Sequence, residues 1–260
     1  MTQTNAAGNY AVVNGLTMYY EIHGAGFPLV LIHGGGSDMY VTFGRVLHLL
    51  AQNHQVIAVD LQAHGRTPDR GVPTSFEQDA DDVAALLKSI GIGQADVMGF
   101  SNGGNTAMQL AIRHPQLVHK IVIASSFYKR NGFIPGFWDF MPNASLDNMP
   151  QPLKDAFLAI NNDQAALETM HARDRDRMLA FEDWSDDAIR SITMPALVIA
   201  GDKDVITPEH SLELYRTLPN AQLCILPAGH GDYIGEVEET AGGNYPAITI
   251  IEEFLTGAKA

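Results

Sequence analysis

The sequence predicts an α/β protein with a mostly parallel sheet covered by helices on both faces, and three observations support this. Short unbroken apolar runs alternate with segments of helical periodicity. The chain begins with two β-type runs around Asn14-Gly15, a dipeptide that favours a tight hairpin. Several apolar runs end in glycines, as expected of strands buried on both faces. One core suffices for 260 residues of which 46% are hydrophobic.

The order of the elements follows from these patterns. After the hairpin we expect buried strands at residues 28–34, 54–61, 95–100, 120–126, 195–201 and 221–228. Helical spacing predicts helices within residues 41–53, 75–92, 105–114 and 247–255. Residues 127–190 contain no buried-strand run and are rich in aromatic residues, Met and Pro, so we expect a helical insertion folded over one sheet edge.

Composition and charge exclude several classes of protein. Lys and Arg number 16 against 30 Asp and Glu, giving a net charge of −14, which disfavours nucleic acid and anionic membrane surfaces as partners. We see neither a signal peptide nor an apolar run of the ~20 residues needed to cross a bilayer, and expect a cytoplasmic protein. Cys224 is the only cysteine, so it can form no intramolecular disulfide or cysteine-based metal site.

The stretch GFSNGG places Ser101 directly after an expected strand and directly before an expected helix. A sharp turn there lifts a side chain out at the carboxyl end of the sheet, and Gly99, Gly103 and Gly104 permit the close backbone approach. The glycine turn in LIHGGGSD follows a neighbouring strand and offers backbone N–H groups. We expect the amides of Gly35 and Asn102 to form an oxyanion hole. The alternative, a phosphate-binding loop, lacks the required spacing and lysine.

A nucleophilic serine needs a base and a group that orients the base. His230 follows the last expected strand between glycines and is our candidate base, with His64 second. His33, at the start of the glycine turn, is interpreted as a residue that holds the loop by hydrogen bonds. For the acid we choose Asp204, which leaves a strand in GDKDVITP.

The other nearby carboxylates fit less well. Asp202 is interpreted as a turn residue, and Asp232 lies too close to His230 in sequence to reach the far ring nitrogen easily.

Together the motifs HGGG, DLQAHGRT, GFSNGG, GDKDVITP and GH resemble the α/β-hydrolase superfamily in order and spacing over nearly the whole chain. The resemblance implies an eight-stranded sheet, with a core formed by residues 1–126 and 191–260 and a helical cap at 127–190 between strands six and seven. It also implies Ser101 as nucleophile, Asp204 as acid, His230 as base, and the Gly35 and Asn102 amides as oxyanion hole. Departures at Gln62, Ala63 and Asn102, and a long acidic loop over residues 235–246, leave the subfamily open.

The substrate pocket is expected next to these motifs and under the cap. Its candidate lining residues, several of which could instead be packing residues, are Gly36, Met39, Phe100, Phe133, Phe137, Trp138, Phe140 and Met141. HARDRDR could offer Arg173, Arg175 or Arg177 to a substrate carboxylate, but an exposed helix with alternating charges is the preferred interpretation.

These features predict a serine hydrolase, a carboxylesterase for small to medium acyl esters that works through an acyl-enzyme on Ser101 without metal or organic cofactor. Two alternatives stay open: a hydrolase of C–C bonds in β-diketone-like substrates that uses the same triad, and a ligand receptor on the same fold. The expected partner is a small-molecule ester, and the expected state is a monomer or homodimer.

Overall fold

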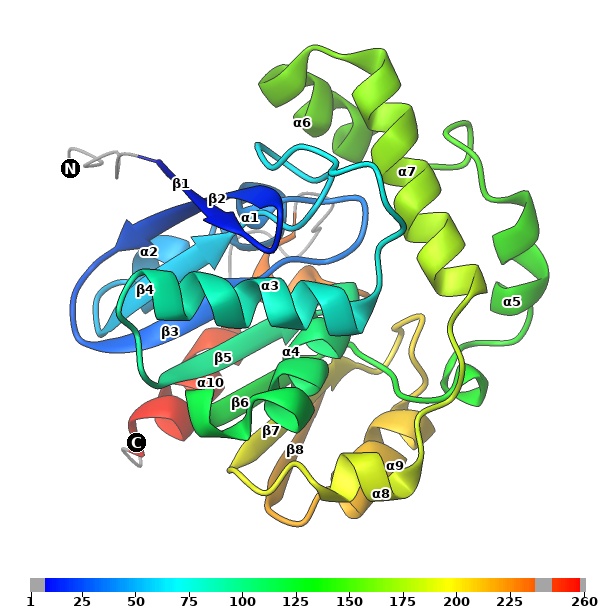
Figure 1. Cartoon of the computed structure of the whole chain (residues 1–260). Helices are drawn as coiled ribbons and strands as arrows, with labels where there is room; N and C mark the ends of the chain where they lie inside the picture. The colour runs from blue at the N-terminus through cyan, green and yellow to red at the C-terminus, as the bar shows by residue number, and fades with distance from the viewer. Residues whose placement is uncertain (1–7, 237–244, 258–260) are drawn as a thin grey trace.

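The computed structural model describes residues 8–236 and 245–257, which form one eight-stranded sheet with helices around it (Figure 1). The strand order is β1-β2-β4-β3-β5-β6-β7-β8; β1 pairs antiparallel with β2, β2 pairs antiparallel with β4, and all further pairs are parallel. The predicted fold class, including the hairpin at Asn14-Gly15 and the eight-stranded sheet, is confirmed.

The bounds of the elements are close to those expected. The strands are β1 Asn9–Val13, β2 Leu16–His23, β3 Phe27–Ile32, β4 His54–Val59, β5 Ala95–Phe100, β6 Val118–Ala124, β7 Ala196–Gly201 and β8 Ala221–Leu226. The helices are α1 Met39–Phe43, α2 Leu47–Leu50, α3 Phe76–Ser89, α4 Asn102–Arg113, α5 Phe137–Phe140, α6 Gln151–Asn161, α7 Gln164–Leu179, α8 Asp186–Arg190, α9 Pro208–Thr217 and α10 Pro246–Thr256.

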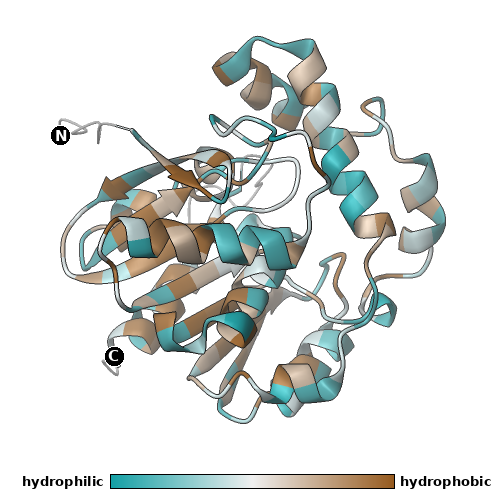
Figure 2. Cartoon of the chain, in the orientation of Figure 1, coloured by the Kyte–Doolittle hydropathy of each residue, from teal (hydrophilic) through white to brown (hydrophobic). Residues whose placement is uncertain are grey.

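Two apolar layers enclose the sheet. Side chains of α3, α4, α8 and α9 form a buried cluster with one face of the strands, and those of α1, α2 and α10 form a second cluster with the other face. Figure 2 shows the result as largely brown strands in the middle of the molecule, flanked by helices with mixed faces. The parallel strands are apolar throughout because both of their faces are buried.

Helix α3 illustrates how local sequence fixes an element beside the site. Ser75 caps its start, with its hydroxyl accepting a hydrogen bond from the Gln78 amide at 3.1 Å. Acidic residues occupy the first turn and Lys88 the last, as the helix dipole favours. The apolar side of α3 packs against the sheet.

The chain between β6 and β7 carries helices α5, α6, α7 and α8. In Figure 1, α6 and α7 lie above the carboxyl ends of the strands and α5 lies outside α7. An isolated bridge between Phe133 and Ile206 joins the start of this segment to the loop after β7. The last helix of this segment, α8, packs against α4 and α9 in the core layer rather than over the site. We therefore use the name cap for residues 127–181.

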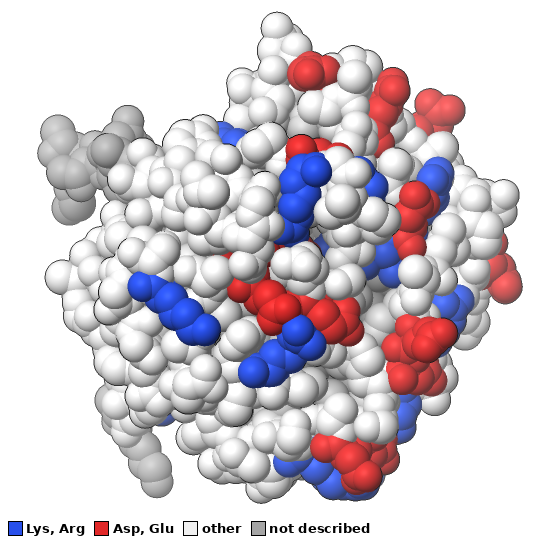
Figure 3. Space-filling view, in the orientation of Figure 1, with Lys and Arg blue, Asp and Glu red and all other residues white. Residues whose placement is uncertain are grey.

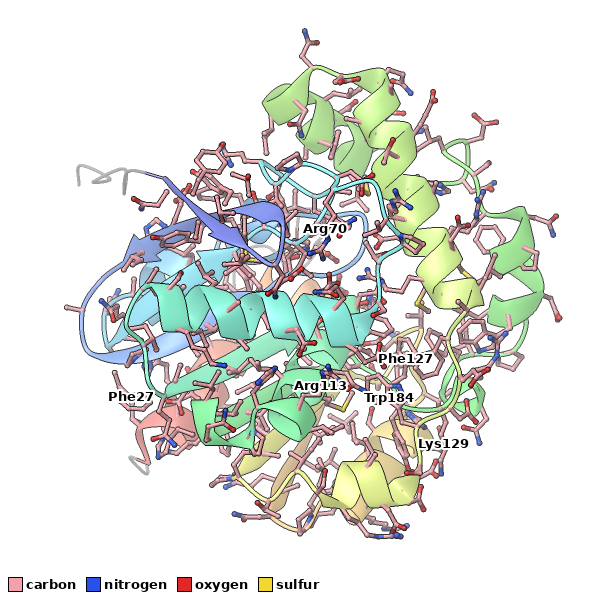
Figure 4. The ribbon with its side chains drawn as sticks, in the orientation of Figure 1. Phe27, Arg70, Arg113, Phe127, Lys129 and Trp184 are labelled. Atoms are coloured by element: carbon pink, nitrogen blue, oxygen red, sulfur yellow. The ribbon has the colours of Figure 1, made fainter. Side chains whose placement is uncertain are left out.

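Aromatic side chains fill the junction between cap and core. Phe127 and Trp184 lie near the C-terminal end of α7 in Figure 4, and the Phe127 ring contacts the rings of Phe133 and Phe181. On the face seen in Figure 3, acidic and basic side chains lie beside one another. Within the described ranges, no helix combines the length and apolar character needed to span a membrane.

Candidate active site

Ser101 occupies a strained turn between β5 and α4. Its φ of 52° and ψ of −123° lie in a region that non-glycine residues rarely adopt. A Cβ on Gly99 would lie 2.1 Å from the Gly103 oxygen, and one on Gly103 would lie 2.2 Å from the Ile32 oxygen. The glycines are therefore required by space, as the sequence predicts. The turn presents Ser101 to a cavity under the cap.

His230 lines the same cavity and forms a hydrogen-bonded pair with Asp204. The His230 Nδ1 lies 2.6 Å from the Asp204 Oδ1, and the Ile206 amide donates to the same oxygen at 3.1 Å. Burial opposes protonation of His230, but the Asp204 carboxylate outweighs it and raises the pKa of His230 above its ordinary value. Burial likewise disfavours ionised Asp204, but the charge and hydrogen bond of His230 hold the Asp204 pKa below its usual range.

Two residues behind Asp204 were not found from the sequence. The hydroxyl of Ser125 donates to the Asp204 Oδ2, and the Tyr233 hydroxyl lies 2.6 Å from the Ser125 Oγ. Ser125 itself has a φ of 50°, an unusual conformation that turns the chain at the end of β6. A serine after an apolar strand carries no sequence signal for this role, because the contact joins residues 79 positions apart.

The rival carboxylates accept backbone hydrogen bonds instead, Asp232 within its own loop and Asp202 from the loop after β8. Asp202 Oδ1 accepts from the Ala228 amide at 3.1 Å, and Asp232 Oδ2 accepts from the Gly229 amide at 2.8 Å. Asp204 is thus the carboxylate that the structure joins to the His230 ring by a hydrogen bond.

The two histidines near the glycine turn have structural partners. His33 Nε2 accepts the Leu61 amide at 3.0 Å and its Nδ1 lies 2.7 Å from the Gly34 oxygen, so His33 holds the loop as predicted. Burial lowers the pKa of His33 to about 3, which keeps the ring neutral. The second candidate base, His64, is buried and lies 2.9 Å from Asp174 of α7.

The glycine turn and the start of α4 supply amides to the cavity. Gly35, Gly36 and Asn102 all line it. Asn102 is the first residue of α4, so its N–H has no partner within the helix. The Gly36 amide donates to the Asp174 Oδ2 at 2.5 Å and is thereby engaged. Gly35 and Asn102 both lie at the cavity, and the role of their amides as oxyanion donors stays a prediction.

The cavity has a volume of about 350 Å³ and is mostly apolar. Its lining combines the residues just named with side chains of the cap and of the loop after β7, chiefly Phe127, Phe133, Phe137, Phe140, Met141, Met149, Leu153, Met170, Met178, Val205 and Ile206. Polar side chains at its wall include His171, Asp174 and Arg175. Of the expected pocket residues, Gly36 and Phe137 are in place, as are Phe133, Phe140 and Met141.

Three expected pocket residues lie elsewhere, and the prediction for them is wrong. Met39 is fully buried in the core under the sheet; the methionine beside Gly36 is Met149 of the cap, 3.2 Å from where a Gly36 Cβ would lie. Phe100 is also buried, and its ring supports His230 with 4.7 Å between ring centroids. Trp138 packs behind Phe137.

Trp138 has a polar partner outside the cavity. Its ring lies over the Arg130 guanidinium, and its Nε1 donates to the Arg130 oxygen at 2.6 Å.

The HARDRDR stretch forms part of α7, as expected, but it is not uniformly exposed. Arg173 pairs with Asp69 of the core, and Arg175 pairs with the adjacent Asp176. Arg177 is buried and pairs with both Asp79 and Asp174. Alternating charges predict an exposed face, whereas α7 docks a charged face against buried charges of the core. Among the described residues, no group of three or more His, Cys, Asp or Glu could hold a metal ion.

Comparisons with known proteins agree with this architecture. The family model "Alpha/beta hydrolase family" matches residues 29–241. The chain is 29% identical to the 2-hydroxymuconate semialdehyde hydrolase of Pseudomonas sp. (strain CF600), over 97% of this chain and 95% of that protein. It is 28% identical to the pimeloyl-[acyl-carrier protein] methyl ester esterase of Neisseria meningitidis serogroup A / serotype 4A, over 81% of this chain and 73% of that protein.

Solved structures share the fold. The meta-cleavage product hydrolase of Pseudomonas fluorescens IP01 superposes with a TM-score of 0.79 at 21% identity, covering 97% of this chain and 98% of that one. The enol-lactonase of Burkholderia xenovorans LB400 gives a TM-score of 0.75 at 23% identity, covering 95% and 100%. The sheet order, the turn at Ser101 and the family match lead to one conclusion: this chain belongs to the alpha/beta hydrolase family.

Proposed function

We propose that the protein is a serine hydrolase that cleaves esters with small to medium apolar acyl groups. The observation that carries the proposal is the strained Ser101 turn, which opens into the same apolar cavity as the hydrogen-bonded His230–Asp204 pair. Strained backbone at a cavity wall, beside a hydrogen-bonded acid–base pair, is typical of a nucleophile held ready for attack.

The reaction follows from the roles that these groups can take. His230, oriented by Asp204, accepts the proton of the Ser101 hydroxyl while its oxygen attacks the ester carbonyl. The resulting oxyanion is stabilised by the amides of Gly35 and Asn102. Collapse expels the alcohol, which takes the proton from His230 and leaves an acyl-enzyme. A water molecule, deprotonated by His230, then releases the acid and restores the serine.

The cavity supports an apolar acyl group. Its wall is built mainly from phenylalanine, methionine and aliphatic side chains, which gain free energy by covering alkyl or aryl groups. A volume of about 350 Å³ accommodates a small to medium ligand rather than a long chain. We therefore expect activity to pass through a maximum as the acyl chain is lengthened.

The second candidate is hydrolysis of a C–C bond next to a carbonyl by the same triad. It is favoured by two relatives named 2-hydroxymuconate semialdehyde hydrolase, at 29% and 30% identity over nearly the whole chain. A methyl ester esterase among the relatives supports the ester reaction in the same way.

One set of assays separates these functions. The wild-type protein and Ser101→Ala are treated with a fluorophosphonate and supplied with p-nitrophenyl esters of increasing chain length and with 2-hydroxymuconate semialdehyde. We expect labelling and ester turnover in the wild type only. Turnover of the semialdehyde alone would favour the C–C hydrolase, and labelling without any turnover would favour a receptor. Full activity in Ser101→Ala would refute the proposal.

A further inference from the structure

The Asp174 carboxylate of cap helix α7 reaches the glycine turn of the core. Its Oδ2 accepts the Gly36 amide at 2.5 Å and lies 2.9 Å from the His64 Nε2. A Cβ built on Gly35 would lie 3.1 Å from the same oxygen. Asp174 thus touches the segment that carries the Gly35 amide, although it is 138 positions away from Gly36 in sequence.

The turn needs an external anchor because glycines have little stiffness of their own. Gly34, Gly35 and Gly36 follow one another, and Gly36 has a φ of +65°. The Gly36 nitrogen and the Gly35 carbonyl belong to one planar peptide unit. A hydrogen bond that fixes the Gly36 N–H therefore also restricts the orientation of Gly35, whose own N–H is the candidate oxyanion donor.

The core holds Asp174 in turn. The His64 Nδ1 lies 2.8 Å from the Gln62 oxygen, so both nitrogens of this buried ring face acceptors. Arg177, one turn further along α7, binds the Asp174 Oδ1 and also donates to Asp79 Oδ2 of α3 at 2.7 Å. A carboxylate held by two buried cationic partners is a rigid point of attachment rather than a mobile surface group.

We propose that Asp174 is a positioning residue that orients the Gly35 amide toward the oxyanion, so that the oxyanion hole is complete only when α7 of the cap is docked on the core. The inference rests on the proposed serine-hydrolase function. It assigns to a cap residue a part in transition-state stabilisation that the core motifs alone do not provide. Asp174 acts through the glycine turn and takes no part in proton transfer.

The competing explanation is that Asp174 only fastens the cap. A neighbouring contact provides the matched control: Arg173 binds Asp69 at 2.8 and 3.1 Å, joining α7 to the core without touching the glycine turn. Arg173→Gln removes a cap attachment one residue away from Asp174. If attachment alone mattered, Arg173→Gln and Asp174→Ala would have similar effects on catalysis.

The experiment compares Asp174→Ala, Asp174→Asn and Arg173→Gln on a p-nitrophenyl ester that the wild type hydrolyses. A cooperative thermal unfolding transition first shows that each variant is folded. Removal of one oxyanion donor typically lowers kcat by about 10²–10³-fold, and a donor that is misplaced but present should cost less. We expect Asp174→Ala to lower kcat about 30-fold with KM changed less than about 3-fold. Asp174→Asn keeps an oxygen for the Gly36 amide and should stay within about 5-fold, and Arg173→Gln within about 2-fold.

A transition-state analogue distinguishes positioning from loss of structure. A trifluoromethyl ketone forms a tetrahedral adduct with the serine and places an oxyanion in the hole. Its inhibition constant should rise in Asp174→Ala by the same factor as kcat/KM falls, and should change little in Arg173→Gln. Equal losses in both variants, or an unchanged inhibition constant in Asp174→Ala, would overturn the proposal.

Two outcomes keep the inference separate from the proposed function. If the wild type hydrolyses no ester and its Ser101 is not labelled by a fluorophosphonate, the proposed function fails first. If the wild type is active and Asp174→Ala matches it, only the positioning role fails. Should Asp174→Ala not fold, the same comparison is made on Asp174→Leu, which fills the space of the carboxylate, accepts no hydrogen bond from the Gly36 amide and leaves Arg177 paired with Asp79.

Discussion

Removal of the Ser125 hydroxyl tests the support behind the candidate acid. The Asp204 carboxylate receives hydrogen bonds from His230, Ile206 and Ser125, and Ser125 is the one on Oδ2. A hydrogen bond to a charged group contributes roughly 1.5–3 kcal/mol. If the whole of this free energy stabilised the transition state alone, loss of the hydrogen bond would lower the rate by about 10- to 150-fold. Because the bond also stabilises Asp204 in the free enzyme, we expect about a 10-fold lower kcat.

Two substitutions at this position separate the hydroxyl from the backbone. Ser125 has a φ of 50°, which favours glycine over residues with a Cβ. Ser125→Gly and Ser125→Ala both remove the hydroxyl and should lower kcat on a p-nitrophenyl ester equally. Ser125→Gly should nevertheless have a free energy of unfolding about 1 kcal/mol higher than that of Ser125→Ala, and it should therefore unfold at a higher temperature. Activity within twofold of the wild type in both variants would refute the role assigned to Ser125.

Three further predictions concern the same region. The kcat/KM of ester hydrolysis should fall on the acid side with a midpoint above pH 6.5, because Asp204 raises the pKa of His230 and the base must be neutral. In Asp204→Asn the midpoint should move to lower pH, because the carboxylate is gone while burial still lowers the pKa of His230. Gly103→Ala should abolish labelling by a fluorophosphonate and lower the free energy of unfolding by about 1–3 kcal/mol, because the new Cβ would lie 2.2 Å from a backbone oxygen. Arg177→Met should lower the free energy of unfolding in urea by about 3–5 kcal/mol at pH 8, since it leaves the Asp79 carboxylate buried without its cation. The effect of Arg177→Met should shrink at pH 5, because burial raises the pKa of Asp79 to about 6 and the protonated acid needs no cation. The first expectation would be contradicted if the acid-side midpoint were the same in Asp204→Asn as in the wild type. The second would be contradicted by full labelling of Gly103→Ala, and the third by an effect of Arg177→Met that does not change with pH.

The sheet and the placement of the candidate triad followed from local pattern. Apolar runs that end in glycines predict buried parallel strands, and the carboxyl ends of such strands meet at one edge. Ser101, Asp204 and His230 each follow a different strand, so the order of the chain already places them near one another. The structure then joins His230 to Asp204 by a hydrogen bond, and brings Ser101 and His230 to one cavity.

The pocket was predicted less well because its wall comes from side chains of several elements. Met39 and Phe100 are close to the motifs in sequence, yet both point into the core under the sheet. Nearness along the chain does not determine on which side of a strand or helix end a side chain lies. Met149, from the cap, occupies the place beside the glycine turn that was expected for Met39.

The fold, the serine turn and the three strand ends that carry the candidate triad could be predicted from the sequence, because each depends on residues adjacent in the chain. The burial of charged side chains could not, because it depends on contacts between distant segments. Asp174 and Arg177 stand in a stretch that has the composition of an exposed helix, and His64 stands in a distant loop. The burial of Arg177 and His64, and the partial burial of Asp174 between them, depend on how the cap docks on the core, since each charge is stable there only beside partners that the fold brings together.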